Sequence, residues 1–318
     1  MPRQKGSALL LALLIMALIA SIAVTTGDEL QRALVRNQTL QWQTEAKWAL
    51  SGNETIILSQ LAGNMPLSKA IHRPGKIDDM IIEYQLRDLH SCFNVNALQR
   101  AAPPAASQPV DASAAAEAQA PSSAAIFTQL VRHSTTLDSE AAERLTQRVV
   151  EWINAAPLPA GANEQAKTKH RLPPLVDISE LRMVPGLELT HYRQLKPWLC
   201  VLPESALKIN INALEAADAP LLSAMTNNAL SPDEAKRFIQ SRPAQGWDKP
   251  EAVTAWLMKN NFSSIEKIMP LLTLTGNYFL LSQWAMREEQ RYELHSLIKY
   301  DGKVIHIKQR KYGISEIN

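Results

Sequence analysis

The chain begins with an apolar segment that is long enough to cross a membrane. No Asp, Glu, Lys or Arg occurs from Gly6 to Gly27, and Arg3 and Lys5 precede this stretch. About 20 apolar residues span a bilayer as a helix, and a positively charged flank stays on the cytoplasmic side. The pattern predicts a single-pass membrane helix over residues 7–27, with a cytoplasmic N-terminus and the bulk of the chain across the membrane.

Three interpretations of this segment compete. A secretory signal peptide is disfavoured, because the run exceeds the roughly 7–15 residues of a signal core and no A-x-A pattern stands beside a turn at its end. A plain signal anchor stays open. The third is a type IV prepilin leader, which the short basic stretch, Gly6, the small Ser7 and the unbroken apolar run resemble. In that case the prepilin peptidase would cut between Gly6 and Ser7.

Position 11 bears on this choice. Most prepilins carry Glu five residues into the mature chain, where this sequence has Leu11. A carboxylate inside a bilayer needs a partner, which in pilins is the terminal amine of the subunit already in place. A subunit with no neighbour above it does not need the Glu. Leu11 therefore indicates either a plain anchor or a subunit at the tip of a filament.

The helical pattern continues beyond the membrane segment. Apolar residues recur at helical spacing from Leu30 to Leu50, and polar residues fill the opposite face. This is typical of a helix half buried on a domain. A helix from about Ser7 to Leu61 would be longer than roughly 80 Å at 1.5 Å per residue. We expect half of it in the membrane and half packed on a sheet.

A period of two marks the strands. The segment from Asp79 to Arg87 alternates from Ile82 onward, which predicts a half-buried strand. The same period returns from about Leu271, and Asp301-Gly302 is a hairpin turn signal. We expect an antiparallel meander with strands over 278–281, 291–300 and 303–310, which forms one αβ domain with the long helix and the early strand.

Helical patterns dominate the middle of the chain. Gln99 to Ala125 is rich in Ala, Pro and Ser and is expected to be a mobile surface loop. A short helix is predicted over 126–131, and a longer one over 138–153. The predicted apolar face of the longer helix consists of Ala141, Leu145, Val149, Trp152 and Ile153.

Three sequence signals mark further helix starts in this region. Asp177 with Glu180, and Ser231 with Glu234, are spaced as capping boxes. Lys249-Pro250 precedes another apolar pattern, and Pro is favoured at the first position of a helix. A mostly helical domain is therefore expected inside the αβ domain.

One short motif occurs twice. Phe93-Asn94-Val95-Asn96-Ala97-Leu98 and Ile209-Asn210-Ile211-Asn212-Ala213-Leu214 both read apolar-Asn-apolar-Asn-Ala-Leu. We interpret both as strand-to-helix turns capped by Asn rather than as ligand sites. Asn96 is the expected cap in the first copy, and Asn212 with Glu215 forms the expected capping box in the second.

Composition narrows the function. The 318 residues carry a net charge of +2, which gives no electrostatic reason to bind nucleic acid. The chain contains two cysteines, Cys92 and Cys200. On the far side of a bacterial inner membrane they can form one disulfide, and two buried thiols are the alternative. No phosphate loop, G-x-S-x-G, H-E-x-x-H or paired C-x-x-C occurs, so we expect no enzyme.

A DNA-binding alternative comes from two stretches. Leu181 to Leu187, with Val184-Pro185-Gly186, resembles the hairpin of a helix-hairpin-helix motif. Residues 209–242 resemble the helix-hairpin-helix unit of competence-type DNA receptors, which are also membrane-anchored. In such units a Gly-x-Gly turn lets backbone N–H groups approach a phosphate. Here Glu188 follows Gly186 closely, and the second unit has Asn227-Asn228 where the glycines belong. A structural use of the motif without nucleic acid is therefore favoured.

Taken in order, these pieces resemble one family, the minor pseudopilin K of the type II secretion system. The resemblance covers nearly the whole chain. It lies in Gly6-Ser7 with Leu11, 46–61 with Gly52-x-Glu54, 92–98, 151–153, 177–181, 184–186 with Tyr192, 195–198 and 209–213.

The resemblance implies an α+β, pilin-like fold, in which a long N-terminal helix packs on an antiparallel sheet and a large helix-hairpin-helix or SAM-like α-helical domain is inserted. It also implies a tip complex with minor pseudopilins I and J, contacts with minor pseudopilin H and major pseudopilin G, and N-methylation of Ser7 after cleavage. The expected segments are 1–6 leader, 7–27 membrane helix, 28–98 first αβ part, 99–125 loop, 126–270 helical insertion (126–208 and 209–270), and 271–318 C-terminal strands.

Relatives of this family bind calcium through an acid-rich segment after a Trp. This chain departs from that pattern, because Asn154 and Ala156 stand where acids are expected. Calcium prefers several hard oxygen ligands, most of them carboxylates. Glu164 is the one charged ligand left, and Asp177 is too distant in sequence to assign. We therefore expect calcium binding to be weak or absent, and no other cofactor.

Overall fold

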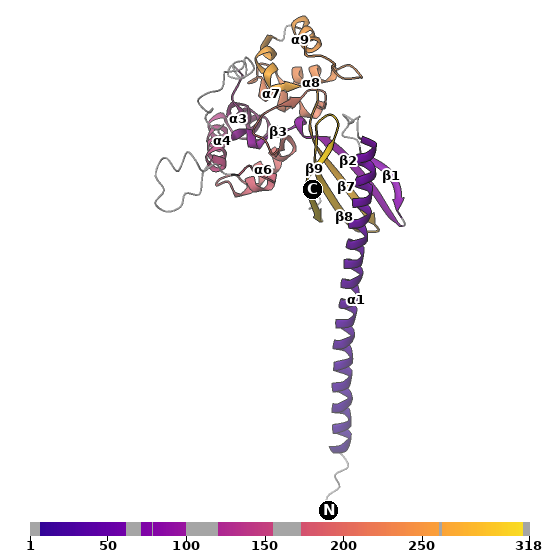
Figure 1. The fold of residues 1–318 in the computed structure, drawn as a ribbon. Coiled ribbons are helices and arrows are strands. Elements are labelled where there is room, and N and C mark those ends of the chain that lie inside the picture. Colours follow the sequence, from indigo (N-terminus) through magenta and orange to yellow (C-terminus); the bar gives the residue numbers. More distant parts are fainter. Residues whose placement is uncertain are drawn as a thin grey trace, which may run out of the picture.

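The computed structural model describes residues 7–61, 71–77, 79–99, 120–154, 173–260 and 263–313. It has three parts (Figure 1). A long helix rises from the N-terminus, an antiparallel sheet packs on its distal half, and a helical region lies beside the sheet and extends beyond the end of the sheet that is farther from the N-terminus. This arrangement confirms the predicted fold class.

The long helix α1 runs without a break over Ser7–Leu61, 55 residues, as the pattern predicted. Its membrane-like half carries no charge up to Gly27. Its distal half buries one apolar stripe at spacings of four and seven, which is the stripe that a helix presents to one surface. The buried members of the stripe are Trp42, Ala46, Leu50 and Ile57.

The main sheet has five strands in the order β1-β2-β7-β8-β9, and every pair of neighbours is antiparallel. The strands are β1 Ile71–Ile77, β2 Met80–Asp88, β7 Tyr278–Arg287, β8 Gln290–Tyr300 and β9 Ile305–Gly313. The meander was therefore predicted correctly, although β7 extends six residues beyond the predicted 278–281.

Edge strand β1 is the strand of the main sheet that the sequence did not reveal. Pro74-Gly75 interrupts its pattern, and the register with β2 shifts between His72 and Gly75. Pro is tolerated on an edge strand because its missing N–H is not needed there. A search for alternating apolar and polar residues therefore does not detect this strand, even though its backbone pairs with β2.

One face of the sheet packs on α1. Two apolar clusters lie between them, and both combine residues of the helix with residues of β2, β7 and β8. The first holds Trp42, Ala46, Leu50, Met80, Ile82, Ala285 and Leu294, and the second Ile57, Leu86, Phe279, Leu281 and Ile298.

The predicted Asp-Gly hairpin joins β8 to β9. Gly302 has φ +91°, a left-handed conformation that favours glycine. The Asp301 carboxylate accepts hydrogen bonds from the backbone N–H groups of Val304 (2.8 Å) and Lys303 (3.0 Å). These bonds lower the pKa of Asp301, because they stabilise its charged form.

The helical region is built from short elements around one large apolar core. Two-residue strands form parallel pairs there, β3 Phe93–Asn94 with β4 Leu199–Cys200 and β5 Ile209–Asn210 with β6 Leu272–Thr273. The helices are η1 Leu89–Ser91, η2 Val95–Leu98, α3 Ser123–Ser134, α4 Ser139–Asn154, η3 Ile178–Met183, α6 Leu189–Leu195, η4 Lys196–Trp198, η5 Ala216–Asp218, α7 Ala219–Met225, α8 Pro232–Gln240, α9 Pro250–Lys259 and η6 Ser263–Leu271.

Two local expectations need correction. The predicted loop 99–125 ends early, since α3 begins at Ser123 and Gln99 is buried. In α4 the buried face contains Ala142 and Thr146 in place of Ala141 and Trp152. Thr146 is accommodated in the core because its hydroxyl accepts a hydrogen bond from Thr128 on α3 at 3.0 Å.

Candidate functional site

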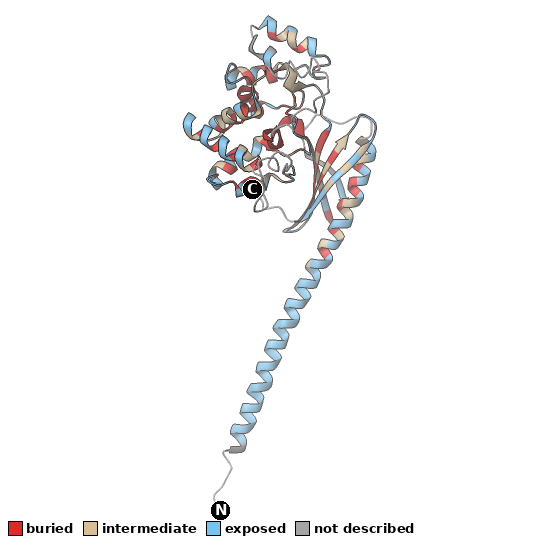
Figure 2. Ribbon diagram, turned by 60° about the vertical axis from the view of Figure 1, so that its left-hand side comes forward, coloured by how far each residue is buried: buried red, intermediate tan, exposed pale blue. Residues whose placement is uncertain are grey.

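The first candidate surface is the N-terminal half of α1. Its apolar side chains from Leu9 to Val35 are exposed, and no other described element packs on them (Figure 2). Leu11, at the position of the usual pilin Glu, has 61% of its surface exposed. By length and composition this is one helix able to cross a membrane. Ser7 begins the helix, and Gly6 lies outside the described residues.

An uncharged face continues along α1 beyond the membrane segment. Trp48 is 71% exposed and Ile56 is 55% exposed, on the side of the helix opposite the sheet. Gly52 lies between them, one turn from each, with open space where a side chain would be. A large exposed aromatic residue beside a glycine is typical of a surface that another helix can approach closely.

Polar contacts fix the other face of α1 on the sheet. Glu54, 1% exposed, accepts hydrogen bonds from Ser296 and from Arg310 (2.7 Å to Nη2). Asn53 donates to the Gln283 side chain at 2.8 Å. The Glu54 hydrogen bond raises the pKa of Arg310. Directional bonds at two adjacent helix positions define both the rotation and the height of α1 against the strands.

A third polar contact lies closer to the membrane end of the sheet. Arg287 on β7 is 3.2 Å from Glu45 on α1 and 2.5 Å from Asp79 before β2. Its guanidinium also lies 4.6 Å from the centre of the Trp42 ring. The cation thus joins three elements, and it covers the indole at the end of the helix–sheet core.

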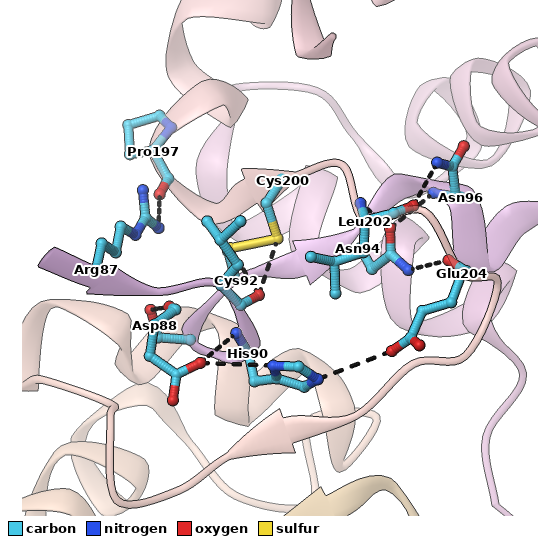
Figure 3. The surroundings of a disulfide bond; sticks show 12 residues. Arg87, Asp88, His90, Cys92, Asn94, Asn96, Pro197, Cys200, Leu202 and Glu204 are labelled. Atoms are coloured by element: carbon cyan, nitrogen blue, oxygen red, sulfur yellow. Dashed lines mark hydrogen bonds and ion pairs between the residues drawn. A yellow bond between two sulfur atoms is a disulfide. The ribbon is translucent and has the colours of Figure 1, made fainter. Parts of the chain in front are cut away.

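The junction between sheet and helical region contains the disulfide (Figure 3). Cys92 follows η1, Cys200 ends β4, and their Cα atoms are 5.7 Å apart across a sequence separation of 108 residues. Both side chains are buried. Nearby, the Arg87 guanidinium donates to the Pro197 carbonyl at 3.1 Å. The disulfide and this hydrogen bond tie the end of β2 to the helical region.

The first copy of the Asn motif lies at this junction. Asn94 Oδ1 accepts from the backbone N–H of Asn96 (3.2 Å) and of Leu202 (3.1 Å), so Asn94 rather than Asn96 caps the turn. Asn96 instead clamps a distant segment: its Nδ2 donates to the Leu175 carbonyl and its Oδ1 accepts from the Leu175 N–H.

The second copy repeats this division of roles. Asn210 Oδ1 accepts from the Asn212 N–H at 3.0 Å, and Asn210 Nδ2 donates to buried Asp88 at 2.6 Å. Asn212 clamps Trp247, donating to its carbonyl (2.9 Å) and accepting from its N–H (2.7 Å). Asn212 therefore does not cap a helix, and Glu215 with Asp218 forms the capping box. In both copies the first Asn caps a turn after a two-residue strand, but the expected strand-to-helix turn is found only in the first copy, since η5 does not begin until Ala216.

The hairpin between α7 and α8 is occupied by protein groups. Asn227 and Asn228 adopt the left-handed conformation, with φ 52° and 63°. Their backbone N–H groups bond to the carbonyls of Ala224 and Ser223. Their side chains bond to Gln129 on α3. The turn therefore offers no free amide nest for a phosphate, and the DNA-binding alternative is not favoured.

The described residues contain no group of three or more His, Cys, Asp or Glu side chains that could hold a metal ion. Glu164, the calcium candidate, lies outside the described residues, as does Ala156. Asn154 donates to the Leu98 and Val150 carbonyls. Asp177 caps η3 and pairs with Lys311. These contacts supply no calcium site in the described part of the chain.

One arrangement that the sequence did not reveal is a Ser–His–Glu contact on the sheet. His295 Nδ1 is 2.9 Å from Ser282 Oγ, and its Nε2 is 2.9 Å from Glu293. Ser282 and His295 are direct partners in the β7–β8 ladder, so their backbone N–H groups lie within the sheet. Ser282 and His295 therefore form a cross-strand side-chain pair, and Glu293 joins it from the same strand as His295.

The structure combines three features: the exposed apolar half of α1, a sheet fixed on the other half of α1, and a helical region that a disulfide joins to the sheet. Together they define a pilin-like protein with a helical insertion. The family model of type II secretion system (T2SS), protein K, matches residues 91–204 in its first part and 209–273 in its second. The chain belongs to this family, and its role is that of a minor pseudopilin.

Individual relatives agree with this assignment. The chain is 31% identical to type II secretion system protein K of Pectobacterium carotovorum, over 98% of this chain and 97% of the relative. It is 30% identical to the Klebsiella pneumoniae protein over the same shares. In fold it is similar to GspK in the GspK-GspI-GspJ complex of enterotoxigenic Escherichia coli, with TM-score 0.67 and 24% identity, covering 88% of this chain and 100% of that one.

Proposed function

We propose that this minor pseudopilin occupies the tip of the periplasmic pseudopilus, in complex with minor pseudopilins I and J. There it would prime the assembly of a filament of major pseudopilin G, with minor pseudopilin H as a further neighbour, for export of folded proteins across the outer membrane. The observation that carries the proposal is Leu11 on an exposed, uncharged half-helix. A topmost subunit has no terminal amine above it, so an unpaired Glu there would only be costly.

The position of the helical region supports the same placement. It lies beside the sheet and extends beyond the end of the sheet farther from the N-terminus (Figure 1). A subunit stacked above this chain along the filament axis would meet that region. A bulky cap is compatible with the last position of a filament and incompatible with the positions below it.

The contact with I and J is expected along the uncharged face of α1. Trp48, Gly52 and Ile56 leave this face open on the side away from the sheet. The relative in the solved complex assembles with GspI and GspJ. A helix from a partner would bury the exposed indole, and buried Trp residues often dominate the free energy of binding.

Maturation is part of the proposal. The prepilin peptidase would cut between Gly6 and Ser7 and N-methylate Ser7. The rest of the chain would lie in the periplasm, with a single membrane pass in the inner membrane. Periplasmic exposure is compatible with the bonded Cys92–Cys200 pair, since disulfides persist in that compartment.

Two measurements test this function. Intact mass of the protein from its native inner membrane should give a chain that begins at a methylated Ser7, and Gly6→Ala should leave the leader attached. Immunogold labelling of filaments sheared from cells that overproduce major pseudopilin G should place this chain at one end only. Label along the filament length would refute the tip position, and an intact leader in the wild type would refute prepilin processing.

A further inference from the structure

A groove of about 310 Å³ lies between the sheet and the helical region. It opens on the sheet face opposite α1, because Leu280 and Leu297 line it while their neighbours Leu281 and Ile298 pack on the helix. The far wall comes from the segment before η3, from η4 and from β4. Volumes of this size fall at the lower end of ligand sites.

The lining of this groove combines an apolar floor with cations. Leu89, Leu199 and Val201 add apolar surface beside the sheet leucines, and Arg87, Lys196 and Lys311 contribute the charges. Of the described residues that line it, Asp177 alone is acidic, and its carboxylate already pairs with Lys311. The groove therefore complements a ligand that has an apolar body and negative charge.

Arg87 is a half-buried cation of this set. It donates one hydrogen bond, from Nη2 to the Pro197 carbonyl, and its Nε is buried without a hydrogen-bond partner in the described structure. Burial lowers the pKa of Arg87, and the nearby Asp218, Glu215 and Asp88 oppose that shift. A carboxylate that entered the groove would restore part of the solvation that this guanidinium has lost.

The neighbouring strand edge indicates what kind of ligand fits. Among the described strands β9 is the last of the sheet and pairs with β8 alone, so its outer backbone groups face away from the ladder. Gln309 and Lys311 of β9 line the groove. An extended peptide beside β9 can use these backbone groups and place alternate side chains over the groove, which an acyl chain cannot do.

We propose that this groove docks an extended, acidic segment of a partner protein, with apolar side chains in the groove and carboxylates on Arg87 and Lys196. The groove faces away from α1, so it stays open when α1 packs against other subunits. Only this last point rests on the proposed function. Binding itself is a property of the isolated chain.

The test uses the full chain in nanodiscs of neutral phosphatidylcholine and a fluorescein-labelled octapeptide of alternating Glu and Leu. Anisotropy should show saturable binding that weakens with salt. Lys196→Glu should weaken it roughly tenfold or more. Lys308→Glu is the matched control, since it makes the same charge change on exposed β9 outside the groove lining, and it should change affinity less than about twofold.

Alternating Lys-Leu and Glu-Ser peptides should bind much more weakly, which would separate charge complementarity from apolar docking. The proposal is overturned if the Glu-Leu peptide does not saturate, or if Lys308→Glu weakens it as much as Lys196→Glu. It is also overturned if decanoate or anionic vesicles bind in a Lys196-dependent way and the peptide does not. None of these outcomes bears on the position of the chain in the pseudopilus.

Discussion

The two halves of α1 share one continuous backbone and differ in everything around it. From Leu9 to Val35 the apolar side chains are exposed, whereas Trp42, Ala46, Leu50 and Ile57 are buried on the sheet. A helix satisfies its own backbone hydrogen bonds, so the first half needs no neighbour in a bilayer. The second half is held in place by burial and by directional polar contacts.

The distribution of charge reflects this difference. The first half has no ionisable group from Ser7 to Gly27, so nothing in it defines a rotation angle about the helix axis. The second half offers Glu45, Asn53 and Glu54 to the sheet. These contacts therefore fix the orientation of the head on α1, and because α1 is continuous, the orientation of the membrane half relative to the head follows from them.

Truncation of matched leucines should show the largest contrast. Leu50→Ala should lower the free energy of unfolding by about 3 kcal/mol, because it leaves a cavity between helix and sheet. Leu14→Ala should change it by less than about 0.5 kcal/mol, since Leu14 is exposed and no described residue outside α1 covers it. Urea unfolding of the full chain in one detergent measures both. Equal losses would mean that the membrane half also packs on the head.

The second largest effect on stability is expected from loss of the buried Glu54 carboxylate. Glu54→Ala should destabilise the head by about 2 kcal/mol, because Ser296 and Arg310 lose charge-assisted hydrogen bonds. The loss is limited because the Arg310 side chain is 42% exposed and can be solvated again. Glu29→Ala on the exposed half is the control, without effect. In a double-mutant cycle, Arg310→Met should lower the free energy of unfolding only slightly in the Glu54→Ala background. If the effects of the two substitutions were fully additive, Glu54 and Arg310 would not be coupled.

The Arg287 contact should be weaker. Arg287→Gln should lower the free energy of unfolding by less than Glu54→Ala does, since the pairs with Glu45 and Asp79 are partly solvated. Part of the effect should persist in 1 M NaCl, where salt screens the ion pairs but not the stacking over Trp42. Arg36→Gln on the exposed half provides the comparison. Complete loss of the effect in salt would assign it to the ion pairs alone.

The smallest effect on stability is expected at the partner-facing side of α1. Trp48→Ala should leave the unfolding midpoint nearly unchanged, because the indole is exposed. It should nevertheless weaken capture of minor pseudopilins I and J about tenfold or more in a pull-down titration. Lys308→Ala, exposed on β9 rather than on this face of α1, serves as control. Unchanged capture by Trp48→Ala would place the partner contact elsewhere.

Local signals in the sequence predicted much of the fold. The length of α1, the alternation in β2, β7 and β8, the Asp301-Gly302 hairpin and the capping boxes at Asp177 and Ser231 were all correct. Each depends on residues within a few positions of one another, so each can be recognised without knowing the rest of the structure. The tip proposal likewise begins at a local feature, Leu11 in an uncharged run.

Contacts between distant residues decided what the sequence left open. The sequence showed that the first copy of the motif contains two asparagines, Asn94 and Asn96. Only the structure shows that Asn96 clamps Leu175, 79 residues away, so that Asn94 is left to cap the turn. The proximity of Cys92 and Cys200, the pairing of β1 and the groove beside β9 are of the same kind. Sequence periodicity fixes which face of an element is apolar. Which partner covers that face is set by packing across the whole chain, and no local pattern records it.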